Sequence, residues 1–83
     1  MRRVYVSLEL EGEEEKLEAL RGALEPEVKS PPGEKGEARV EVRGGKLVVE
    51  MWSDSIGGAR ALINSYLYLL ASAMNSLEEV EKA

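Results

Sequence analysis

The sequence predicts an α+β fold in which a three-stranded antiparallel sheet carries two helices packed on one face, in the order β-α-β-β-α. Three segments alternate apolar and mostly polar residues, which is typical of half-buried strands. Two others repeat apolar residues at helical spacing, and a Gly-Gly pair joins the last two strand-like segments. A sheet with both helices on one face satisfies this order. We expect a single domain over residues 1–83, since no repeat divides the chain.

The first half of the chain predicts a strand, a helix and a loop. In residues 3–10 every second residue is aliphatic, which indicates a strand with one buried face. Three glutamates follow Gly12, and acidic residues in a first helical turn complement the helix dipole. Apolar residues then recur at helical spacing up to Leu24. Pro26 lacks a backbone donor, so we expect it to end this helix before a loop rich in proline and glycine.

The middle of the chain predicts a β-hairpin around Gly44-Gly45, because two glycines suit a two-residue turn between antiparallel strands. Pairing across this turn gives one apolar face and one mostly polar face. The predicted apolar pairs are Val42–Leu47, Val40–Val49 and Ala38–Met51, and the pairs on the other face are Arg39–Glu50, Glu41–Val48 and Glu37–Trp52.

The last helix is predicted from about Ser55 to Glu81, with Asp54 as its N-cap. A helix of about 26 residues spans about 39 Å, whereas strands of six or seven residues span about 22 Å, so we expect about half of it to overhang the sheet. A helix that only covers a sheet normally carries charge on its outer side. We interpret this helix as packing against a partner, and the alternative is that it exposes small residues to solvent. Its uncharged outer side comprises Ala61, Asn64, Ser65, Tyr68, Ala71, Ser72, Asn75 and Ser76.

Two aromatic residues and a valine fall on the sheet face that the helices leave open. Tyr5, Val48 and Trp52 lie there, and large apolar groups on an open face often mark an interface. With Glu50 they form the predicted dimer interface. Ordinary scatter of apolar residues is the alternative, because charged residues share this face.

The composition argues against an enzyme. The chain has no cysteine and no histidine, which removes a thiol nucleophile, a zinc-thiolate site and the usual general base. No P-loop or nucleophile–base motif is present, so we expect no cofactor, no metal and no small-molecule substrate. The net charge of −5 opposes non-specific binding of nucleic acid. The longest uncharged run, residues 61–77, is too short and polar to span a bilayer, so no membrane association is expected.

Two glycine motifs have alternative interpretations. Gly57-Gly58 begins the last helix, where close packing or a late helix start competes with binding of an anion at the helix N-terminus. The charge of Asp54 disfavours the anion. Gly33-Glu34-Lys35-Gly36 matches the GxxG motif of KH-type RNA-binding domains. It precedes a strand and contains an acid, so we interpret it as a turn.

Two stretches resemble the small, Pcc-type dimerisation subunit of the archaeal and eukaryotic KEOPS (EKC) complex. Leu24-Glu25-Pro26-Glu27, followed by Ser30-Pro31-Pro32, is similar to the family's L-x-P-E … P passage. Residues 54–70, DSIGGARALINSYLYLL, resemble the family's D-x-x-x-L-R-A-x-x-N-S-Y-L-R helix, with Arg60-Ala61 and Asn64-Ser65-Tyr66-Leu67 matching position by position. With the length and the element order, the resemblance covers essentially the whole chain.

The resemblance implies a non-catalytic scaffold. KEOPS installs a threonylcarbamoyl group on the adenosine beside the anticodon of certain tRNAs, and a metal-dependent transferase subunit performs the chemistry. The small subunit dimerises and holds this transferase through its helices, which implies a cytoplasmic protein that meets tRNA only within the assembled complex. Two positions depart from the family pattern: Ala59 replaces the family's leucine, and Tyr68 stands where a basic residue is common. These departures disfavour direct tRNA contact from this helix. They also leave open a heterodimer with a paralogue as well as a homodimer. The predicted transferase-binding residues are Arg60, Asn64, Ser65, Tyr68, Leu69, Ala71, Ser72, Ala73 and Asn75.

Two other classes of function remain as alternatives. A free-standing RNA-binding module of KH-like shape would need a basic stripe on its surface. A small acid–base enzyme would need carboxylates that converge in a pocket.

Overall fold

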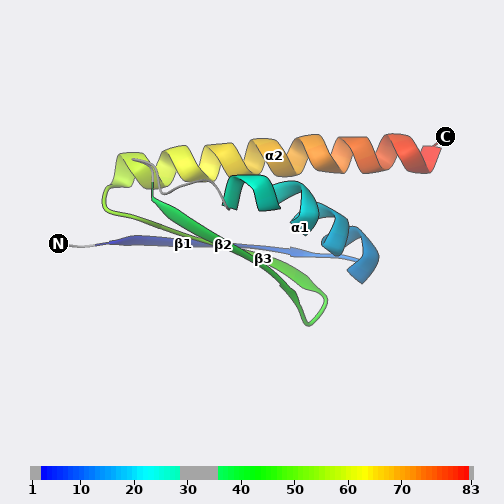
Figure 1. Ribbon diagram of the computed structural model, residues 1–83, viewed down its shortest axis with the longest axis horizontal. Coiled ribbons are helices and arrows are strands. Elements are labelled where there is room, and N and C mark those ends of the chain that lie inside the picture. Colours follow the sequence, from blue (N-terminus) through cyan, green and yellow to red (C-terminus); the bar gives the residue numbers. More distant parts are fainter. Residues whose placement is uncertain (1–2, 29–35, 83) are drawn as a thin grey trace.

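The computed structural model describes residues 3–28 and 36–82, with side-chain surroundings described as far as residue 77. The predicted order β-α-β-β-α is confirmed, with both helices on one face of a three-stranded antiparallel sheet of order β1-β3-β2 (Figure 1). The elements are β1 (Val4–Glu11), α1 (Glu14–Val28), β2 (Glu37–Arg43), β3 (Lys46–Ser53) and α2 (Ile56–Lys82).

The hairpin between β2 and β3 forms as predicted. Gly44 and Gly45 have φ values of 58° and 74°, a left-handed conformation that glycine adopts without steric cost. All six predicted pairs across this turn are observed. Strand β3 also pairs with β1, from Val4 opposite Ser53 to Glu11 opposite Lys46. Strand β3 is therefore central, and β1 lies at an edge of the sheet.

The core lies between the sheet and the two helices. Each fully buried aliphatic side chain contributes about 1.5–3 kcal/mol of hydrophobic stabilisation. Burial also raises the pKa of Tyr66, since it disfavours the charged phenolate. The buried cluster comprises Leu17, Leu20 and Leu24 of α1, Leu47, Val49 and Met51 of β3, and Leu62, Tyr66 and Leu70 of α2.

Helix α1 continues for two residues beyond Pro26, so the prediction that Pro26 ends the helix is wrong. A proline in the last turn removes only the hydrogen bond from its own nitrogen, and little helix follows it. Val28 packs against the core, which favours the extra residues.

The N-cap of α2 is Ser55, and the prediction of Asp54 is wrong by one residue. The Ser55 hydroxyl accepts a hydrogen bond from the Gly58 N–H at 2.9 Å, and the Ser55 carbonyl accepts one from Ala59 at 3.0 Å. Asp54 instead lies 3.6 Å from the Arg3 guanidinium. A Cβ added at Gly57 would meet no described atom within 4 Å, so close packing does not explain that glycine.

Helix α2 packs on the domain as far as Leu77, and only its last turns extend beyond the strands (Figure 1), so the overhang is smaller than the predicted half. Leu69, Ala73 and Leu77 all pack against the core cluster. The strands have seven or eight residues, longer than predicted. The start of α1 also lies beneath the C-terminal half of α2 (Figure 1), where Lys16 faces the same hollow as Leu77.

Candidate protein-interaction site

A shallow hollow lies between the end of α1 and the middle of α2, and we name it the valley. Four of the predicted transferase-binding residues line it, all from α2. The Tyr68 side chain is 74% exposed, so its ring is available to a partner. The lining is uncharged apart from one carboxylate, which suits contact with a largely uncharged surface. The valley is lined by Glu27, Asn64, Ser65, Tyr68 and Leu69.

Helix α1 extends the valley with small residues that sequence analysis did not select. Ala23 and Ala19 lie one and two helical turns before Glu27, so they continue the stripe that lines the valley. Both are exposed, as is Gly22. Small residues let a second helix approach closely, and their repeat at a four-residue spacing is the sequence signal that could have revealed them.

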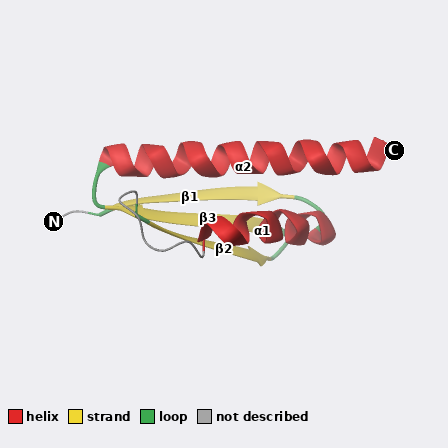
Figure 2. Ribbon diagram, turned by 45° about the horizontal axis from the view of Figure 1, so that its top comes forward, coloured by secondary structure: helices red, strands yellow, loops and turns green. Residues whose placement is uncertain are grey.

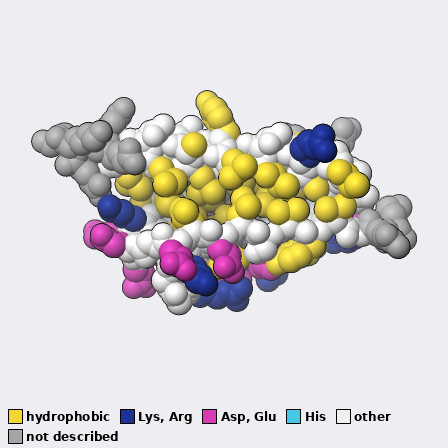
Figure 3. Space-filling view, turned by 180° about the vertical axis from the view of Figure 1, so that it is seen from behind, with side chains coloured by type: hydrophobic (Ala, Val, Ile, Leu, Met, Phe, Trp, Pro, Cys, Tyr) yellow, Lys and Arg dark blue, Asp and Glu magenta, His cyan; other side chains and the backbone are white. Residues whose placement is uncertain are grey.

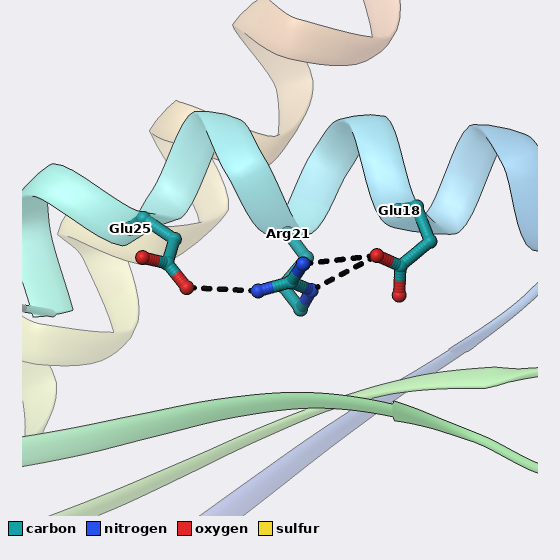
Figure 4. A network of polar contacts seen from close by, with 3 residues as sticks. All are labelled: Glu18, Arg21 and Glu25. Carbon is teal, nitrogen blue, oxygen red and sulfur yellow. Dashed lines mark hydrogen bonds and ion pairs between the residues drawn. The ribbon is translucent and has the colours of Figure 1, made fainter.

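Three charged side chains of α1, Glu18, Arg21 and Glu25, lie together on its other flank, above the sheet (Figure 4). The Arg21 guanidinium donates hydrogen bonds to Glu18 at 2.9 Å and to Glu25 at 2.8 Å. The hydrogen bond to Glu18, followed by that group's negative charge, raises the pKa of Arg21. These three charged side chains do not line the valley, so Glu27 is the one charged residue of its described lining.

The other predicted transferase-binding residues are distributed around α2. Ala71, Ser72 and Asn75 are exposed beyond the valley. Ala73 is partly buried against the core, and Arg60 is exposed in the first part of the helix. The structure therefore brings four of the nine residues together and leaves these five outside the hollow.

A second uncharged surface lies on the opposite side of α2, and sequence analysis missed it. Helix α1 contacts β2 and β3, whereas α2 contacts β3 and β1 (Figure 2). Because β1 is an edge strand, its core-facing side chains are only partly covered. Figure 3 shows apolar side chains in a continuous band along this side of the molecule. We name this surface the α2–β1 flank, and it comprises Val6, Leu8 and Leu10 of β1 with Ile56, Ile63, Leu67 and Met74 of α2.

The α2 residues of this flank share one stripe of the helix. Ile56, Leu67 and Met74 are 71%, 49% and 40% exposed, whereas a core-facing residue such as Tyr66 is 2% exposed. Their successive spacings, with Ile63 included, are those of a coiled-coil seam. The apolar arc of α2 is therefore wider than one sheet requires.

The open sheet face is less accessible than predicted at Val48, which is only 5% exposed. Val48 lies on the central strand, between Glu9 of β1 and Glu41 of β2 in the register. Residues on both neighbouring strands thus flank it. A buried Val48 offers little surface to a second subunit.

Tyr5, Trp52 and Glu50 form one cluster on the same face. The Tyr5 hydroxyl donates a hydrogen bond to Glu50 at 2.6 Å, and the Tyr5 and Trp52 ring centroids are 5.5 Å apart. The Arg39 guanidinium carbon lies 6.0 Å from the Trp52 ring centroid, a cation–π contact. The hydrogen bond to Glu50 raises the pKa of Tyr5, because only the protonated hydroxyl can donate it. A role of these residues in dimerisation stays a prediction.

The described residues provide no alternative chemical site. No three acidic side chains among them converge to hold a metal ion. Arg39, Arg43 and Lys46 each lie within 4.0 Å of a carboxylate, so the described open face has no basic stripe of the kind a KH-like module would need. No helix in the described part of the chain is long and apolar enough to cross a membrane.

The predicted turn at Gly33-Glu34-Lys35-Gly36 lies mostly outside the described residues, as does the Ser30-Pro31-Pro32 stretch. Only Gly36 of these is described. Its φ of 129° and its closeness to the Trp52 carbonyl, with which a Cβ would collide, require glycine there.

The fold is a small α+β domain that exposes uncharged surface on two helices and beside an edge strand. A family model described as Transcription factor Pcc1 matches residues 4–78. The chain belongs to this Pcc1 family, a family of KEOPS subunits, which confirms the resemblance to the Pcc-type small subunit. A comparison with curated proteins finds no match.

Proposed function

We propose that this protein is a non-catalytic KEOPS subunit that dimerises and holds the transferase that makes threonylcarbamoyladenosine beside the tRNA anticodon. The observation that best supports the proposal is that α2 exposes uncharged surface on both sides of its core-facing stripe. A helix that serves only its own domain needs one apolar stripe. The valley and the α2–β1 flank therefore suit two different partners.

The α2–β1 flank suits dimerisation with a copy or a paralogue, because strand pairing and helix packing fit there together. Helix α2 contacts both β1 and β3. If a second β1 pairs antiparallel with the first, the two α2 helices lie two strand spacings apart, about 9.6 Å. Packed helices prefer axis separations of about 8–10 Å. A continuous six-stranded sheet would thus bring both α2 helices to packing distance.

The valley suits the transferase. A helix of that subunit, laid between α1 and α2, would meet the small residues Ala19 and Ala23 on one side and Ser65 and Tyr68 on the other. The valley and the α2–β1 flank lie on opposite sides of α2, so both partners can bind one chain at the same time.

Contact with tRNA belongs to the assembled, cytoplasmic complex in this proposal. The chain carries a net charge of −5, and the described cations of the open sheet face are paired with carboxylates. Both features oppose phosphate binding by the isolated protein.

The test is binding of the purified transferase from the same host to the parent protein and to Ser65→Glu. A carboxylate in the valley would lose solvent without gaining a partner, so the variant should bind at least tenfold more weakly. Arg43→Gln makes the same change of one charge unit on the open sheet face, and it should bind as the parent does. Equal binding by all three proteins would exclude the valley, and no binding by the parent would refute the proposed function.

A further inference from the structure

We infer that the transferase helix in the valley carries an arginine whose guanidinium binds the Glu27 carboxylate and stacks on the Tyr68 ring. The inference rests on the proposed function and names the side chain by which the valley recognises its partner. Two features of the valley support it: an acidic group that the described domain does not neutralise, and an exposed aromatic ring that lines the same hollow.

Glu27 is an acidic residue without a cation of its own. Elsewhere on α1, Glu18 and Glu25 both accept hydrogen bonds from Arg21 (Figure 4), whereas no ion pair joins Glu27 to another described side chain. Glu27 also lies in the last turn of α1, which has no basic residue. The carbonyl groups at a helix C-terminus carry partial negative charge. Both the carboxylate and the helix end therefore favour a cation supplied by a partner.

The Glu27 carboxylate lies toward the space between the two helices. Glu27 belongs to α1, yet it lines one hollow with residues of α2. Burial, and after it the negative charge of Glu27, raises the pKa of the core residue Tyr66 of α2. Because Coulomb interactions weaken with distance, this effect agrees with a carboxylate close to α2. A helix laid in the valley would cover the carboxylate, which is unfavourable unless the partner supplies the opposite charge.

Tyr68 favours arginine over lysine as that charge. Its ring is 74% exposed and lines the same hollow as Glu27. A guanidinium is planar, so it can donate two hydrogen bonds to a carboxylate while its face stacks on an aromatic ring. The ammonium of lysine is a compact, strongly hydrated charge without a flat face. The other lining residues, Asn64, Ser65 and Leu69, are uncharged and leave Glu27 as the one ion-pair partner in the hollow.

The charge is tested with Glu27→Gln, which keeps the shape of the side chain and removes the carboxylate. Binding of the purified transferase, measured by calorimetric titration, should weaken about tenfold or more. Glu18→Gln is the matched control, because it makes the same change of net charge on the other flank of α1, and it should bind as the parent does. Both residues are exposed, so circular dichroism should show near-parental thermal stability for both variants.

Charge reversal and ring replacement test the arginine. Glu27→Arg should weaken binding about a hundredfold, since it opposes like charges. Among arginine-to-glutamate variants of the transferase, one should bind the Glu27→Arg protein more tightly than it binds the parent protein. Tyr68→Leu should weaken binding of the parent transferase about fivefold, whereas Tyr68→Phe keeps the aromatic face and should bind as the parent does.

The outcomes separate the inference from the proposed function. A transferase that does not bind the parent protein would refute both. If the parent binds and Ser65→Glu weakens binding but Glu27→Gln does not, the valley is the interface and the inference alone is wrong. The inference alone is also overturned if no arginine variant of the transferase prefers Glu27→Arg, or if Tyr68→Phe and Tyr68→Leu lose affinity equally.

Discussion

The two sides of α2 differ in the size of their side chains and in the element beside them. The valley combines small and polar residues of α2 with Ala19 and Ala23 of a neighbouring helix. The α2–β1 flank combines large aliphatic side chains with an unpaired edge of the sheet. Exposure to water is least favourable for large aliphatic surface, so in the proposed function the flank binds the permanent partner. The valley is tolerable in water, which suits a partner that joins afterwards.

In the proposed function, one helix thereby serves a core and two partners. The core-facing stripe of α2 fixes the helix on the sheet, and the exposed residues Tyr68 and Leu67 on its two other sides lie outside the core cluster. Substitutions on the three sides of the helix should therefore have separable effects.

The largest effect should come from the core-facing stripe. Leu70 is 9% exposed and packs in the buried cluster, so Leu70→Ala should lower the free energy of unfolding by about 2–5 kcal/mol. Leu70→Glu should prevent folding, since it buries a charge without a partner. Thermal unfolding followed by circular dichroism measures both effects. A folded Leu70→Glu variant of parental stability would show that α2 does not lie on the sheet as described.

The next effect should come from the α2–β1 flank. Leu67 is 49% exposed, so Leu67→Glu should leave the chain folded but place a charge in the proposed dimer interface on the α2–β1 flank. Light scattering should show the mass falling from two chains to one at micromolar concentration. If the variant stays dimeric, the dimer interface lies on another surface, and the cluster of Tyr5 and Trp52 is the next surface to test.

The valley should respond with binding rather than with stability. Ser72 follows Tyr68 by one helical turn and continues the valley stripe, whereas Ala71 follows Leu67 and lies on the other side. Ser72→Glu should weaken transferase binding about tenfold while changing stability by no more than about 0.5 kcal/mol. Ala71→Glu should weaken it less. Calorimetric titration with the transferase measures the affinity of each variant. A weaker affinity of Ala71→Glu than of Ser72→Glu would contradict this placement of the partner.

The smallest effect should come from the open sheet face. The hydrogen bond to Glu50 raises the pKa of Tyr5 in the folded protein. The stabilisation of the folded state by this bond is therefore fully present below the pKa of an ordinary tyrosine, about 10, and is lost as the pH rises through the higher pKa of Tyr5 in the folded state. Spectroscopic titration of Glu50→Gln should show Tyr5 ionising at lower pH than in the parent protein. An unchanged titration would mean that the hydrogen bond is absent in solution.

Periodicity and turn chemistry were sufficient to predict most of the fold. Alternation defined the strands, and the Gly44-Gly45 turn fixed every pair between β2 and β3, because both are local signals. The errors at Pro26 and Asp54 were shifts at helix ends, where neighbouring residues can fill the same role.

The arrangement in space was harder to predict. Nothing local indicates that β3 is central and β1 at the edge, yet this order buries Val48 and uncovers the α2–β1 flank. Three valley residues of α2, Asn64, Ser65 and Tyr68, were predicted from the uncharged side of the helix, and the fourth, Leu69, was predicted only as a transferase-binding residue. The contribution of α1 to the valley depends on how the two helices pack against each other. Hydrophobic periodicity within each helix gives no information about that packing.

The central claim is that the two sides of α2 bind different partners, and one paired measurement tests it most directly. The mass and the transferase affinity of Leu67→Glu and Ser72→Glu should be measured side by side. The account predicts that Leu67→Glu is a monomer that still binds the transferase, and that Ser72→Glu is a dimer that binds it about tenfold more weakly. If either variant loses both properties while remaining folded, the two sides form a single interface and the account is wrong.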